Sequence, residues 1–203
     1  NLGGALAAGV GVSKDEALAV RWLRRAADQG DARAMSNLGV MLLSGRGVKK
    51  DEALAVRWLR RAAEKGHPSA MNHLGIMLAD GRGVTKDAAL AVSWYRRAAE
   101  KGDLHAMSNL AFVLAEGRGV AKDEVLAAAW FRRAADQGYP EAMCNLGALL
   151  AEGRGVAKDE VLAAEWYRRA AEKDHPLAMS NLGVMLANGR GVAKDEALAA
   201  EWY

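Results

Sequence analysis

The sequence is poor in cysteine, proline and long apolar stretches. Cys144 is the single cysteine among 203 residues, so an internal disulfide is excluded and no oxidising compartment is implied. No apolar run approaches the roughly 18 residues that a membrane-spanning helix needs. No block of five like charges is present to suggest a tail that binds nucleic acid. We therefore expect no membrane segment, and the sequence leaves the compartment open.

What the sequence has in abundance is a repeat. Hydrophobic residues make up 51% of the chain and charged residues 26%, with a net charge of +3, which favours a packed chain over a disordered one. Each tryptophan lies 36 residues from the next, and a fixed period in this range indicates an array of small helical or strand units. The six are Trp22, Trp58, Trp94, Trp130, Trp166 and Trp202.

The period divides the chain into units of one length. We interpret residues 1–203 as a single array with four whole repeats, 31–66, 67–102, 103–138 and 139–174, and with partial repeats at 1–30 and 175–203. Asn1 aligns with Asn37, and Tyr203 with Tyr167, at positions that we expect inside helices. The chain is therefore expected to be a fragment, a processed form or part of a longer array.

Each repeat reads as two helices joined by a glycine-rich link. In repeat 31–66, apolar residues at helical spacing predict helix A over 32–43, with Asp31 as its N-cap. Gly-Arg-Gly follows at 45–47, and the two glycines predict positive φ or close backbone approach. Asp51 suits the N-cap of helix B, and Gly66 suits its end. Gly39, in the middle of helix A, predicts that helix B crosses there.

One such hairpin cannot bury its own apolar face, but stacked hairpins can. The sequence therefore predicts an all-α protein, an α/α solenoid of 36-residue helix-turn-helix repeats that forms a right-handed superhelix. We expect helices A to line its inner, concave wall and helices B its outer wall.

The repeat resembles that of the Sel-one-like repeat (SLR) family, a relative of the tetratricopeptide repeat. The matching residues, shown for one repeat, are Ala34, Leu38, Gly39, Gly45, Arg46, Gly47, Val48, Asp51, Ala55, Trp58, Ala62, Ala63, Gly66 and Ala70. The resemblance covers the whole chain and implies an α/α solenoid whose members act as adaptors and scaffolds for protein complexes. One branch of that family is cysteine-rich and held by disulfides, and this sequence lacks those cysteines.

One polar position on helix A is a candidate for partner binding. In related tetratricopeptide domains, the Asn at this place lines a groove and bonds an extended peptide, and an amide can both donate and accept. The alternative is that each of these side chains bonds a neighbouring helix or water. The residues are Asn37, His73, Asn109, Asn145 and Asn181.

Neighbouring helix A positions vary between repeats and would form a shallow groove beside that polar position. Plain surface variation is the alternative. The apolar residues of the groove are Val40, Ile76, Phe112, Ala148 and Val184, and we include a second variable position, Ser36, Asn72, Ser108, Cys144 and Ser180.

Paired arginines recur on helix B, beginning with Arg24 and Arg25. Arginine can hold phosphate, but an acid follows the first arginine by four residues in each repeat, as Asp28 does here, which is the spacing of ion pairs on one helix. We therefore favour a solvated outer face over a phosphate site.

No set of residues indicates catalysis, a metal or a cofactor. The four histidines have no partner at metal-ligand spacing, and Cys144 has no base beside it. We expect no enzyme, no metal and no cofactor.

The favoured function is a protein-interaction scaffold that binds a peptide or partner protein along the concave helix A surface. An RNA-binding helical-repeat protein is the alternative from another class, although nucleic acid is not the partner we expect. An engineered repeat scaffold without a native ligand is a further alternative. Uncapped ends would expose apolar faces, which predicts head-to-tail self-association.

Overall fold

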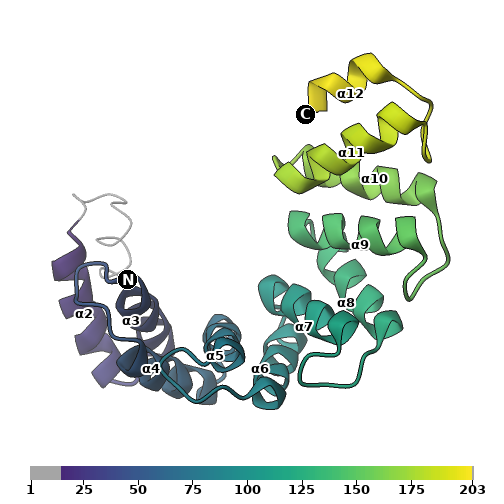
Figure 1. The fold of residues 1–203 in the computed structure, drawn as a ribbon. Helices are drawn as coiled ribbons and strands as arrows, with labels where there is room; N and C mark the ends of the chain where they lie inside the picture. Colours follow the sequence, from purple (N-terminus) through teal and green to yellow (C-terminus); the bar gives the residue numbers. More distant parts are fainter. Residues whose placement is uncertain (1–14, 203) are drawn as a thin grey trace. The chain divides into compact units, whose positions relative to one another are not determined.

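The computed structural model describes residues 15–202, and this part of the chain folds into eleven helices with no strand. The expected helix A of repeat 1–30, and Tyr203, lie outside the described residues. Labels follow Figure 1. The A helices are α3 (Ala32–Ser44), α5 (Pro68–Asp80), α7 (Leu104–Glu116), α9 (Pro140–Glu152) and α11 (Pro176–Asn188). The B helices are α2 (Glu16–Asp28), α4 (Glu52–Glu64), α6 (Ala88–Glu100), α8 (Glu124–Asp136), α10 (Glu160–Ala171) and α12 (Glu196–Trp202).

The predicted aspartates start every B helix. The Asp51 carboxylate accepts a hydrogen bond from the Leu54 amide at 2.8 Å, which satisfies one of the amides that a helix leaves unpaired at its start. The other five caps, at 2.9 Å, are Asp15, Asp87, Asp123, Asp159 and Asp195.

The A helices use different caps at one equivalent position. Asp31 accepts from the Ala34 amide at 2.6 Å. In α5 and α11 a histidine takes this place, and its ring nitrogen Nδ1 accepts at 3.3 Å from Ala70 or Ala178. Tyr139 makes no cap bond with its side chain, so Pro140 at the first turn marks the start of α9.

Each B helix that the structure follows to its end turns through a residue with positive φ. Gly66 has φ +88°, as expected for the residue just past a helix end. Asp174 replaces that glycine in one repeat and adopts φ +59°, and it is the one non-glycine residue with positive φ in the described range. The left-handed turn is therefore kept even where its preferred residue is absent.

Packing divides the chain into two compact units, residues 1–106 and 107–203. In the first unit, α2 to α6 pack in consecutive pairs, and in the second, α8 to α12 do the same. Figure 1 shows α9, α10, α11 and α12 following one another as a stack. The all-α solenoid of helical hairpins is thereby confirmed, whereas the handedness of the superhelix and the single continuous domain stay predictions.

The glycine inside helix A marks the crossing of the two helices of a hairpin. A Cβ added to Gly75 would lie 2.6 Å from Tyr95 Cε1, and one added to Gly39 would lie 2.7 Å from Leu59 Cγ. In these two hairpins the residue that follows the tryptophan fills the space left by the glycine, and the crossing of helix B that the sequence predicts at Gly39 is confirmed.

Candidate partner-binding surface

The predicted polar position lies at the accessible edge of each A helix. Asn37, His73, Asn109, Asn145 and Asn181 are all half-buried, next to core leucines. The apolar residues three positions later share that helix face. Among these, Val40, Ile76 and Ala148 are half-buried, whereas Phe112 is 45% exposed and Val184 is 40% exposed. A polar and an apolar strip therefore run side by side on the A helices of each unit, and we call the pair the helix A face.

The polar strip is not uniform in its hydrogen bonding. The Asn181 amide lies 3.9 Å from Cys144 Sγ on the preceding A helix, and His73 Nδ1 lies 2.7 Å from the Ser69 carbonyl oxygen of its own helix. Within residues 15–202, the side-chain amides of Asn37 and Asn145 have no protein partner. The predicted contact to a neighbouring helix therefore forms at Asn181, and the half-buried amides of Asn37 and Asn145 keep their donors and acceptors available to a ligand.

The second variable position of helix A was expected in the groove, and that expectation is wrong. Ser36, Asn72, Ser108 and Cys144 are buried, whereas Ser180 of α11 is exposed. The contact from Asn181 to Cys144 identifies this position as the seam between successive A helices. A single helix cannot reveal which of its polar positions the next repeat will cover.

The one cysteine, Cys144, is free and buried. Its desolvation raises the pKa of the thiol to about 11, so the nucleophilic thiolate is scarce near neutral pH. No group of three or more histidine, cysteine or acidic side chains is arranged for a metal within residues 15–202.

In four of the five Gly-Arg-Gly links, the arginine has a role that the repeat pattern did not indicate. Its guanidinium reaches back to the glutamate at the start of the previous B helix, thirty residues earlier. The link therefore joins neighbouring repeats through an ion pair between arginine and glutamate, which we call the staple. The four pairs, with their shortest nitrogen–oxygen distances, are Arg46–Glu16 (2.8 Å), Arg82–Glu52 (3.0 Å), Arg154–Glu124 (2.9 Å) and Arg190–Glu160 (2.9 Å).

Three of these glutamates, Glu52, Glu124 and Glu160, also bond a lysine two residues earlier, at 3.0 Å for Lys50 and Glu52. The hydrogen bond from Lys50, followed by that from Arg82, lowers the pKa of the Glu52 carboxyl. One repeat has Ala88 in place of the glutamate, and Arg118 lies over the ring of Phe112, 4.9 Å from its centre.

The second glycine of the link is required for this staple. A Cβ on Gly83 would collide with the carbonyl group of Glu52 and would lie 2.8 Å from the Ala53 amide nitrogen. Gly83 also has φ +65°, where other residues are strained. Two backbones therefore meet here without room for a side chain.

The paired arginines of helix B divide their roles. The second of each pair stacks on the tryptophan three residues earlier, for example Arg97 at 4.3 Å from the centre of the Trp94 ring. The expected ion pairs four residues apart, such as Arg60 with Glu64, are absent from the described part of the chain. The first arginine of each pair is exposed, which agrees with a solvated face. The other stacked pairs are Arg25–Trp22, Arg61–Trp58, Arg133–Trp130 and Arg169–Trp166.

Comparison with protein families decides the identity of these hairpins. The Sel1 repeat matches six consecutive segments, residues 1–31, 32–67, 68–103, 104–139, 140–175 and 176–203. The chain belongs to the Sel1 repeat family. Sel1 repeat proteins are in general protein-interaction scaffolds, and the family is non-catalytic.

Solved structures place the chain among other Sel1 repeat proteins. A Sel1 repeat protein from Oxalobacter formigenes is 33% identical with a TM-score of 0.91, and the match covers 99% of this chain and 80% of that one. The protein c5321 of uropathogenic Escherichia coli, a protective antigen displaying an SLR fold, is 36% identical with a TM-score of 0.87. That match covers 100% of this chain but 43% of the E. coli chain, so the present sequence spans less than half of that relative.

A more distant structure shares the fold alone. Cysteine-rich protein B of Helicobacter pylori is 23% identical with a TM-score of 0.52, over 64% of this chain and 92% of that one. The comparison with curated proteins found no match. In the described range, no helix combines the length and the apolar character that crossing a membrane requires.

Proposed function

We propose that this Sel1 repeat chain is an adaptor that binds an extended segment of a partner protein along the helix A face. The observation that carries the proposal is the pairing of half-buried amides, which have no partner within residues 15–202, with apolar side chains on the same helices. A free amide such as that of Asn145 can bond a peptide group, and apolar residues three positions later can hold the peptide's side chains.

The comparison of positions between repeats also supports binding of a partner along the helix A face. The core, the caps and the staples recur in nearly every repeat, because each is needed for folding. The apolar strip of the helix A face changes instead, from Ile76 to Phe112, Ala148 and Val184. Variation of the accessible apolar strip beside a largely constant scaffold suits recognition of one particular sequence.

Two variants within the second unit test this proposal. Phe112→Arg combined with Val184→Arg alters exposed positions, and the matched control Arg132→Glu alters the exposed face of α8. Dodecapeptides selected from a displayed random library against the wild-type protein are measured against each variant. We expect binding to fall at least about tenfold in the double variant and to stay unchanged in the control.

A third variant isolates the amide. Asn145→Ala removes a side chain that has no partner among the described residues, so its folded state loses no internal bond. A peptide bonded to this amide would lose about fivefold to tenfold in affinity, the size of one neutral hydrogen bond. Selected peptides that bind all variants equally would place recognition elsewhere and overturn the proposal.

RNA binding is separated from this function by its dependence on salt. The second arginine of each pair on helix B stacks on a tryptophan, as Arg97 and Arg169 do. Half of the paired arginines are therefore less available for phosphate contacts, which weakens the case for RNA binding. An electrophoretic shift with single-stranded RNA that weakens steeply with salt would favour the alternative.

A further inference from the structure

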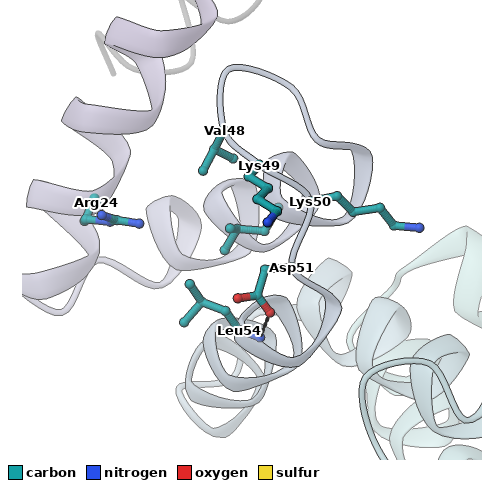
Figure 2. A pocket seen from close by; sticks show the side chains of 7 residues that line it. Arg24, Val48, Lys49, Lys50, Asp51 and Leu54 are labelled. Carbon is teal, nitrogen blue, oxygen red and sulfur yellow. Dashed lines mark hydrogen bonds between the residues drawn. The ribbon is translucent and has the colours of Figure 1, made fainter.

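A second surface, away from the helix A face, has the character of a binding site. A shallow hollow in the first unit lies between α2, α3 and the start of α4. Its apolar part is formed by Leu42, Val48 and Leu54, and its basic part by Arg24 and Lys49 (Figure 2). The hollow therefore combines an apolar floor with two cations from different elements.

The other two charged residues of the hollow are already engaged. The Asp51 carboxylate caps α4 through the Leu54 amide at 2.8 Å, and Lys50 pairs with Glu52 at 3.0 Å. Figure 2 shows Lys50 extending away from the hollow. Arg24 and Lys49 have no ion pair within residues 15–202, so both charges are available to a ligand.

Comparison between repeats indicates that Lys49 is not needed for folding. Its neighbour Lys50 is a lysine in every repeat, in keeping with its constant position before the helix B cap. The position of Lys49, in contrast, holds Thr85, Ala121, Ala157 and Ala193 in the later repeats. A second lysine at this link is therefore a property of this one repeat.

We propose that this hollow binds an acidic segment of a partner protein in which a carboxylate neighbours a branched aliphatic side chain. Lys49 and Arg24 bind the carboxylate, while the half-buried Val48 and Leu54 cover the aliphatic group. The hollow has no exposed aromatic ring on which a nucleobase could stack, so charge and apolar area together favour a peptide over a nucleic acid.

Small peptides test the two halves of the site by nuclear magnetic resonance on ¹⁵N-labelled protein. The probe is acetyl-Leu-Glu-amide, the uncharged control is acetyl-Leu-Gln-amide, and acetyl-Ala-Glu-amide lacks the branched side chain. We expect the first to shift amide signals of Arg24 and of residues 42–54, and the two controls to bind more weakly.

The residues at the position of Lys49 in other repeats guide the choice of protein variants. Lys49→Ala copies the residue found at Ala121 and Ala157, so the fold is kept, and we expect a loss of about threefold to fivefold in affinity, as for one exposed charge contact. Ala157→Lys should create a second set of shifts around its own link. This hollow is separate from the helix A face, so peptide binding to Asn145 should be unchanged in Lys49→Ala.

Three results would overturn the assignment. Equal binding of the glutamine peptide would leave no role for the cations. Equal binding of inorganic phosphate would mark a general anion site. Unchanged affinity in Lys49→Ala would show that the extra lysine does not contribute.

Discussion

Replacing Gly83 by alanine tests whether the Gly-Arg-Gly link joins neighbouring repeats. The substitution has two costs. Alanine at φ +65° costs about 1 to 2 kcal/mol because its Cβ approaches its own carbonyl oxygen. The Cβ would also collide with the Glu52 carbonyl group on the previous repeat, and forced overpacking costs about a further 1 to 3 kcal/mol. We expect a total destabilisation of about 2 to 5 kcal/mol.

Gly102 provides the matched control in the same unit. It has φ +89°, but a Cβ there would meet nothing within 4 Å, so Gly102→Ala carries the conformational cost without the collision. The assay is urea unfolding followed by circular dichroism, compared through the midpoints and slopes of both variants. Gly83→Ala should unfold at a clearly lower urea concentration. Equal midpoints for the two variants would refute the reasoning, because the close backbone approach of Gly83 to Glu52 would then contribute nothing to stability.

Three further predictions concern single side chains. Burial lowers the pKa of His67, whose Nδ1 must be unprotonated to cap α5, so stability should fall as the pH drops below about 6.5, the ordinary pKa of histidine. His67→Asp, which copies Asp31, should flatten that fall in urea midpoints. The thiol of Cys144 has a pKa raised to about 11, so at pH 8 it should react with iodoacetamide at least about a hundredfold more slowly in the native protein than in the urea-unfolded protein. Comparable reaction rates in the two states would contradict the burial of Cys144. Gly75→Ala forces a Cβ to 2.6 Å from Tyr95 Cε1. We expect the free energy of unfolding, measured in urea, to fall by about 1 to 2 kcal/mol, because the better helix propensity of alanine offsets part of the overpacking. A gain in stability would contradict the crossing of the two helices at this glycine.

The elements of the fold could be predicted because their causes are local. Asp51 caps a helix within three residues of itself, and Gly66 ends that helix within two, so both are visible in a single repeat. The role of Gly39 was also predictable, because a glycine at the centre of a helix weakens that helix unless a neighbouring element needs the space.

Contacts between repeats were harder to foresee. Arg82 and Glu52 are thirty residues apart, and only the way in which repeats stack brings them together. The sequence did hold a signal, an arginine between two glycines in five of the six repeats, but nothing in a single repeat indicates the glutamate with which that arginine pairs.

The helix A face was predicted in part for the same reason. Asn145 and Phe112 lie at the accessible surface as expected, because they flank the apolar stripe of their own helices. Ser36 is instead covered at the seam with the next repeat, which one helix does not reveal. The stacking of Arg97 on Trp94 was also missed, because the acid at helical spacing from the arginine pair suggested a different partner.

The most direct measurement of the central claim is site-specific photo-cross-linking with the selected peptides. Benzoylphenylalanine is placed at Val184 on the helix A face and, in a separate variant, at Arg132 on α8. If peptides bind along the helix A face, we expect a peptide adduct from position 184 and none from position 132. Adducts from position 132, with none from position 184, would contradict it.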